Sequence, residues 1–243
     1  ADAWSEPQLF QLDENFAPLR VAGVPPDYFC ADGQRWGNPL YDWKKMRRDK
    51  FRWWLRRLHS AGGMFDWLRI DHFICFANYY SIPASCPTAR EGKWVKAPGK
   101  ALFKRVERAL PDLKIIAEDL GEVGPRVRRL INYFGYPGMK VIQFGFDSDK
   151  TNPHFPGNIV QNSVAYTGTH DNDTIMGWWE KASEPVKKLA LKTLPAADTI
   201  CEAMIDCVFA SVADTAIVPM QDFLQLGGEA RMNYPGTVGG NWL

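Results

Sequence analysis

Three short apolar segments of this chain each run directly into a group of acidic residues, and this arrangement constrains the fold more than any other feature. The segments span 65–72, 113–121 and 163–173. A buried carboxylate costs free energy unless it is solvated, paired or used in chemistry. We therefore expect buried strands that release their acids at one edge of a parallel sheet, as at the active-site rim of a (β/α) barrel.

Helical patterns separate these apolar segments along the chain. The expected helices span 44–61, 100–110, 125–134, 183–194 and 197–212, and the expected strands span 64–70, 113–118, 139–144, 163–168 and 215–219. Such alternation predicts an α/β fold with a parallel sheet. Because a closed barrel needs eight strands and only five are expected, the sequence predicts a partial (β/α)8 TIM barrel. Residues 1–43 show neither period, and we expect a long ordered loop there.

Composition narrows the choice of partners and compartment. The net charge is +1 over 243 residues, which gives no support for nucleic-acid binding. No signal peptide or bilayer-spanning apolar stretch is visible, and five scattered cysteines include no Cys-x-x-Cys pair. We expect a cytoplasmic protein that binds no membrane. Because no second histidine lies at ligand spacing and no Gly-rich phosphate loop is present, we expect no metal and no cofactor.

Two charged residues at the end of the first apolar segment suggest a reactive carboxylate. Strand alternation places Arg69 and Asp71 on one face of the strand. A nearby guanidinium keeps a carboxylate ionised, as a nucleophile requires. A purely structural ion pair explains the same spacing, and the residues alone leave both interpretations open.

The other two acidic groups can also be interpreted in two ways. Glu118 and Asp119 point to opposite faces, so only one can face the rim, where a neighbouring carboxylate would raise the pKa of Glu118 and suit it to donate a proton. The alternative is that this pair only begins a loop. The group at 170–173 suits hydrogen bonding to sugar hydroxyls, or an Asx-rich turn. Converging carboxylates of this kind suggest glycoside chemistry.

Seven segments, in order, resemble the 4-α-glucanotransferases called amylomaltases or disproportionating enzymes. They span 21–29, 33–41, 69–73, 116–121, 137–144, 167–174 and 231–237, and they include Arg-Ile-Asp-His-Phe and Thr-Gly-Thr-His-Asp-Asn-Asp-Thr. The resemblance implies barrel strands from about four to eight, with long loops over the active site. It implies a substrate-loop subdomain at 1–43, inserted before strand four, and the C-terminal part of the catalytic barrel at 44–243.

The resemblance also implies roles for individual residues. Asp71 would be the nucleophile, Glu118 the acid/base, and Asp171 would bind ring hydroxyls of the sugar being cleaved. Arg69 and His170 would support that same sugar. The other implied substrate contacts are Asp27, Phe29, Gln34, Trp36, Phe144 and Asn241.

The implied activity is retaining transfer of α-1,4-glucan segments to the 4-hydroxyl of glucose or another glucan. Maltooligosaccharides and α-1,4-glucans are the expected partners. Two alternatives remain, an α-glucan hydrolase of the same architecture and an inactive fragment that only binds glucan. The family's first three strand–helix units are not in this sequence, and we expect residues 1–243 alone to be unstable. The chain also departs from the family at Ile74-Cys75, where Arg-Gly is common, and at Cys30.

Overall fold

The computed structural model describes residues 2–26, 30–121, 123–147, 150–237 and 239–242. The chain divides into two compact units, Ala1–Tyr136 and Pro137–Leu243, each of which is described by itself. The predicted site residues Asp27 and Phe29 lie outside the described residues.

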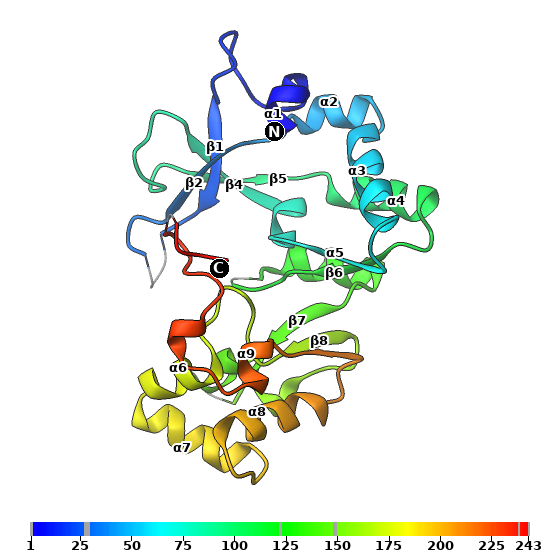
Figure 1. Cartoon of the computed structure of the whole chain (residues 1–243). Coiled ribbons are helices and arrows are strands. Elements are labelled where there is room, and N and C mark those ends of the chain that lie inside the picture. Colours follow the sequence, from blue (N-terminus) through cyan, green and yellow to red (C-terminus); the bar gives the residue numbers. More distant parts are fainter. Residues whose placement is uncertain (1, 27–29, 122, 148–149, 238, 243) are drawn as a thin grey trace. The chain divides into compact units, whose positions relative to one another are not determined.

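The first unit contains a parallel pair of strands, β3 (Trp67–Ile70) and β6 (Lys114–Ala117). The helices α3 (Arg52–Gly62), α4 (Gly99–Ala109) and α5 (Pro125–Phe134) contribute to the same hydrophobic core as β6 (Figure 1). Ile115 and Ala117 of β6 lie in this core, and Leu68 and Ile70 of β3 pack against it. The two predicted strands are thus confirmed, and Leu68 and Ile70 lie on the side of the helices as expected.

A second sheet in this unit was not predicted. Strands β1 (Arg20–Val24), β2 (Gln34–Pro39), β4 (Asn78–Pro83) and β5 (Lys93–Lys96) form an antiparallel sheet in the order β2-β1-β4-β5. The expectation of an ordered loop over 1–43 was therefore wrong for β1 and β2. Neither strand shows the usual alternation of apolar and polar residues. Strand β2 is mostly exposed, and β1 contains Gly23, where a β-carbon would collide with the Gln34 backbone.

The single helix predicted over 44–61 is two helices. After the short helix α1 (Asp2–Ser5), Asp42 caps α2 (Trp43–Arg48) by accepting hydrogen bonds from the backbone N–H groups of Lys44 and Lys45. Lys50 and Phe51 have φ values of 60° and 59°, which break the helix before α3. The left-handed backbone lets Phe51 bury its ring in the core at 3% exposure, and this tertiary contact overrides the continuous helical pattern.

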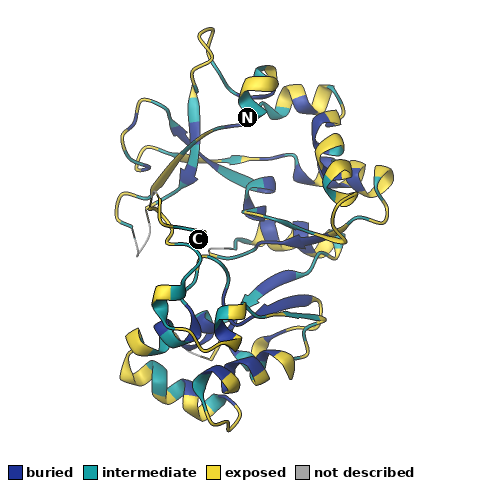
Figure 2. Cartoon of the chain, viewed as in Figure 1, coloured by how far each residue is buried: buried dark blue, intermediate teal, exposed yellow. Residues whose placement is uncertain are grey.

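The second unit contains three parallel strands, β7 (Gly138–Val141), β8 (Ser163–Tyr166) and β9 (Thr215–Ile217). Its helices are α6 (Ile175–Lys181), α7 (Glu184–Thr193), α8 (Ile200–Phe209) and α9 (Met220–Phe223). Figure 2 shows β7 and β8 almost wholly buried, whereas the helices expose one face. The strand predicted over 139–144 ends at Val141 and continues as a 3-10 turn over Ile142–Phe146.

Helix α6 was not predicted, and a buried acid explains how it is placed. Asp222 is 1% exposed and accepts hydrogen bonds from the Thr167 hydroxyl at 2.6 Å and the Ile175 N–H at 2.8 Å. The first residue after β8 and the first turn of α6 are thereby attached to α9. The loop that follows β8 is consequently held at both ends.

Candidate active site

Asp71 and Glu118 occupy equivalent positions at the ends of two paired strands. In the parallel register Ile70 faces Ala117, so these two acids are the next residues on each strand. The backbone N–H of Glu118 donates to the Ile70 carbonyl at 3.1 Å, and the Phe73 N–H donates to the Glu118 carbonyl at 3.0 Å. The ladder therefore continues past the strands and fixes both acids at the carboxyl-terminal edge of the pair.

The carboxylate of Glu118 is held by backbone donors on both sides. The His72 N–H donates to Oε2 at 2.7 Å, and the Leu120 N–H donates to Oε1 at 2.8 Å. One donor belongs to the residue directly after Asp71, and the other lies on the loop that follows Glu118 itself. The Glu118 carboxyl group is thus fixed in orientation close to the end of β3.

Burial controls the protonation of Glu118. The residue is 7% exposed, and burial raises the pKa of its carboxyl group, with the charge of Asp71 raising it further. The two backbone N–H donors and Arg69 act in the opposite direction, but burial prevails. Repulsion between the carboxylates, from which the raised pKa was predicted, contributes less to the shift of the Glu118 pKa than burial does. A carboxyl group with a raised pKa can hold a proton for donation at neutral pH.

Asp71 has a contrasting environment. Its side chain is 75% exposed, and Arg69 Nη2 lies 2.8 Å from its Oδ1 atom. An exposed pair of this kind adds little to stability. The guanidinium nevertheless contacts one carboxylate oxygen of Asp71 and so orients the side chain. Ile116, which shares a strand face with Glu118, lies opposite Arg69 in the register.

His72 connects this pair of acids to strand β2. Its φ of 45° turns the chain sharply after Asp71, and its ring meets Trp36 edge-on, with centroids 4.8 Å apart and planes at 86°. Burial lowers the pKa of His72, while Asp71 opposes that shift. The Trp36 indole donates to Gln34 Oε1 at 3.1 Å. The predicted substrate residues Gln34 and Trp36 therefore lie close to the end of the strand that carries Asp71, through contact with a neutral histidine for which no role was predicted.

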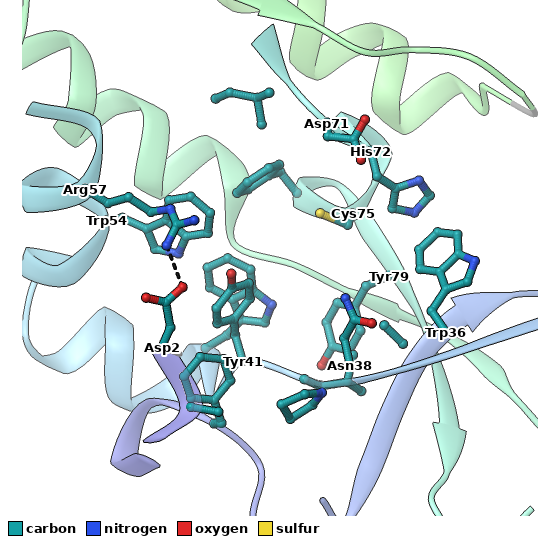
Figure 3. A pocket seen from close by; sticks show the side chains of 18 of the residues that line it. Asp2, Trp36, Asn38, Tyr41, Trp54, Arg57, Asp71, His72, Cys75 and Tyr79 are labelled. Carbon is teal, nitrogen blue, oxygen red and sulfur yellow. Dashed lines mark hydrogen bonds and ion pairs between the residues drawn. The ribbon is translucent and has the colours of Figure 1, made fainter. Parts of the chain in front are cut away.

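A cavity of about 870 Å³ opens beside Asp71 (Figure 3). Trp36, His72 and Tyr79 line it, and Asp2 and Arg57 form an ion pair of 2.6 Å on another part of its lining. Cys75 also lines it, and burial, followed by Asp71 and Glu118, raises the pKa of its thiol to about 12. The Cys75 thiol, which stands where glycine is common in the family, is therefore neutral, and the apolar Ile74 stands where arginine is common.

In the second unit, Asp171 is held by residues from the C-terminal segment. Asn233 Nδ2 donates to Asp171 Oδ1 at 2.7 Å, and Arg231 Nη2 donates to the Asp171 carbonyl at 2.8 Å. His170 Nε2 lies 3.1 Å from Asp171 Oδ2, and the His170 ring packs against Trp242 at 5.3 Å. Arg231 and Asn233 lie in the segment 231–237, which resembles the family, but no role was predicted for either residue.

The two remaining predicted contacts have different neighbours. Asn241 accepts a hydrogen bond from the Tyr234 N–H at 2.9 Å and donates to the Thr237 hydroxyl at 3.0 Å, so it closes the C-terminal loop. Phe144 packs edge-on against His154 at 5.6 Å. Burial and Lys140 lower the pKa of His154 to about 4, so this ring is uncharged at neutral pH.

Comparison with known proteins decides the family. A sequence model of the family described as 4-alpha-glucanotransferase matches residues 1–243. The chain belongs to this family. It is 48% identical over 251 residues to a 4-alpha-glucanotransferase of Thermus thermophilus, covering 100% of this chain and 50% of that protein. A chloroplastic 4-alpha-glucanotransferase of Arabidopsis thaliana is 47% identical over 244 residues, covering 100% of this chain and 42% of that protein.

The solved structure of an amylomaltase from Streptococcus agalactiae in complex with acarbose superposes with a TM-score of 0.93 at 44% identity. The match covers 99% of this chain and 49% of that one. The chain thus spans about half the length of the curated relatives it matches. Its fold is the predicted α/β class, part of the (β/α)8 barrel of the 4-alpha-glucanotransferases.

Two absences hold for the part of the chain that the structure describes. No group of three or more His, Cys, Asp or Glu side chains is arranged to hold a metal ion. None of the described helices is both long and apolar enough to span a bilayer.

Proposed function

We propose that the protein transfers α-1,4-glucan segments to the 4-hydroxyl of glucose or another glucan, with retention at the anomeric carbon. The observation that carries this proposal is the contrast between neighbouring acids, a buried Glu118 with a raised pKa and an exposed Asp71 paired with Arg69. Two carboxyl groups separated by environment in this way divide the roles of acid and nucleophile.

The proposed reaction has two steps. Asp71 attacks the anomeric carbon and forms a covalent glucosyl ester, while the proton of Glu118 passes to the leaving 4-oxygen. The 4-hydroxyl of the acceptor then attacks the ester, gives its proton to Glu118 and releases Asp71 as a carboxylate. No metal or organic cofactor enters either step. The carboxyl groups of a retaining pair lie roughly 5–5.5 Å apart, and we expect that separation here.

We further propose that the predicted residues act as the family resemblance implies. Asp171 binds ring hydroxyls of the sugar being cleaved, Arg69 and His170 support that same sugar, and Gln34 and Trp36 contact the glucan. Residues 1–43 act as a substrate-loop subdomain, and 44–243 supply the C-terminal part of the catalytic barrel. The other proposed glucan contacts are Asp27, Phe29, Phe144 and Asn241. The protein works in the cytoplasm and binds neither nucleic acid nor membrane.

Transfer is favoured over hydrolysis because aromatic side chains approach the nucleophile. The Trp36 and His72 rings line the cavity beside Asp71, and a glucan bound against them would leave less room for water at the glucosyl ester. We expect the full-length protein to convert maltotriose into both longer and shorter maltooligosaccharides plus glucose. Chromatography of the products over time is the measurement. Shorter products alone at every time point would favour the hydrolase instead.

The His72 ring should act as a positioning residue for Trp36. His72→Asn tolerates the left-handed backbone but loses the ring, so we expect kcat/KM for maltotriose to fall by about tenfold and the hydrolysed fraction to rise. His72→Phe keeps an aromatic edge and should recover most of the transfer. Equal losses in both variants would show that the ring contact is unimportant. The variant Trp36→Ala combined with His72→Asn should be no worse than Trp36→Ala alone.

Asn233 should position the Asp171 carboxylate. Asn233→Ala removes the 2.7 Å hydrogen bond to Oδ1, and we expect kcat to fall by about tenfold because a loosely held group binds the transition state less well. KM should change less than kcat. Asn132→Ala, on the exposed face of α5, is the matched control. Unchanged kcat in Asn233→Ala would remove Asn233 from the proposed site.

A further inference from the structure

A cationic cavity in the first unit has no place in the proposed reaction. Its volume is about 390 Å³, and it shares no charged residue with the cavity beside Asp71. Its charged lining residues are Arg47 of α2, Lys100 of α4, and Arg126 and Arg129 of α5. No acidic residue lines it within the described chain. Four positive charges therefore surround one small cavity in a chain whose net charge is +1.

None of the acids that the structure describes is paired with these four charges. Among the described residues, the ion pairs of 4.0 Å or less include none of the four. Lys100 Nζ lies 3.7 Å from the Tyr133 ring centroid, a contact that holds the ammonium group without cancelling its charge. Like charges gathered in this way repel one another, and a bound anion would relieve that repulsion.

Arg126 is held in place as a donor. Its Nε atom donates to the Ala77 carbonyl at 3.0 Å, and Nη2 donates to the Ala97 carbonyl at 3.5 Å. Both carbonyls belong to residues that line the cavity. A guanidinium fixed by two backbone carbonyls has less conformational freedom to lose when a ligand binds.

Two helices begin at this cavity. Lys100 lies in the first turn of α4 and Arg126 in the first turn of α5. The residues before these helices, Pro98 and Gly124, make no side-chain capping hydrogen bond. The positive ends of both helix dipoles therefore add to the four side-chain charges, as at many anion sites.

The rest of the lining is apolar. Pro98 and Ala101 are half-buried and offer accessible apolar surface, whereas Phe76 and Leu130, at 2% and 7% exposure, form the packed layer beneath. A free inorganic anion would leave this apolar surface unused. The volume also falls within the usual range of sites for small organic ligands, roughly 300–1,000 Å³.

We propose that this cavity binds a phosphate monoester of a small organic molecule such as a sugar. The phosphoryl group lies among the four cations and the organic part lies against Pro98 and Ala101. A phosphate monoester carries a charge of about −2 and three acceptor oxygens. It can therefore accept hydrogen bonds from several arginines at once, which a single carboxylate group does less well. This site is separate from the proposed transfer reaction and does not depend on it.

Calorimetric titration of the full-length protein tests the proposal. The probes are glucose 6-phosphate, inorganic phosphate and glucose, at matched ionic strength. We expect glucose 6-phosphate to bind one site per chain and more tightly than inorganic phosphate. The double variant Arg47→Gln, Arg129→Gln should weaken its binding by at least about tenfold, since charge-assisted hydrogen bonds are lost. The control Arg105→Gln, Arg108→Gln removes the same charge from the exposed face of α4, outside the cavity.

Several results would overturn the proposal. They are the absence of saturable binding by glucose 6-phosphate, equal weakening in the two double variants, and equal affinity for glucose and glucose 6-phosphate. Equal affinity for inorganic phosphate and the ester would show that the apolar lining contributes nothing, and would overturn the assignment of an ester. Thermal unfolding of both double variants, measured without ligand, confirms that each is folded before titration. The Asp71→Asn variant should bind glucose 6-phosphate as the wild type does.

Discussion

Replacing Asp71 by Asn should lower kcat/KM for maltotriose by at least about a thousandfold in the full-length protein, because the amide cannot form the glucosyl ester. Glucan binding should remain, since the amide has nearly the same shape and the side chain is mostly exposed. Kinetics with maltotriose and calorimetry with a maltooligosaccharide measure the two effects separately.

The control for this prediction is Asp66→Asn, an exposed acid just before the same strand. It should retain ordinary activity. If Asp71→Asn turned over maltotriose at a wild-type rate, another residue would have to be the nucleophile. A loss of binding equal to the loss of rate would instead assign Asp71 to substrate recognition.

Replacing Glu118 by Gln should lower kcat/KM by at least about a hundredfold with maltotriose, the usual range for a lost general acid. The loss should be much smaller for the first step with α-glucosyl fluoride, whose leaving group needs no proton. The glucosyl ester on Asp71 should then accumulate, because no base remains to activate the acceptor. Mass spectrometry of the digested protein detects that ester. Equal losses with both donors would exclude Glu118 as the acid.

The raised pKa of Glu118 also sets the direction of two pH effects. The acid form persists to higher pH than in an ordinary glutamate, so the basic limb of kcat/KM should lie correspondingly higher. The folded state holds the Glu118 proton to higher pH than the unfolded state does. The free energy of unfolding should therefore be highest at low pH, as far as Glu118 is concerned, and should fall as the pH rises through the folded-state pKa. Glu118→Gln should reduce the pH dependence of kcat/KM and of the free energy of unfolding. Kinetics and denaturation across a pH series measure the two quantities.

The parallel strands and their acids were predictable because both follow from local sequence. Apolar runs that end in Asp71 and Glu118 fix the face and the edge of each strand without knowledge of distant contacts. The raised pKa of Glu118 was predictable in direction, but not in its main cause. Burial depends on the packing around the residue, which spacing alone does not reveal.

Elements that depend on distant partners could not be predicted. Strands β1 and β2 are defined by their pairing with each other and by the pairing of β1 with β4, rather than by their own alternation. The helix break at Phe51 follows from a core contact. Asn233 reaches Asp171 across 62 positions in sequence. Such a contact has no local pattern, and the only available indication was that its segment resembled the family.

Because main-chain N–H groups hold the Glu118 carboxyl group, many substitutions near it can be accepted. Neither N–H donor depends on the identity of the side chain at 72 or at 120. Substitutions around the acid can therefore accumulate without moving it, provided that the turn itself survives. The Ile74-Cys75 departure lies directly after the turn at His72, and the backbone there still supplies the His72 N–H donor. The position of the Glu118 carboxyl group thus depends on the path of the backbone more than on the side chains next to it.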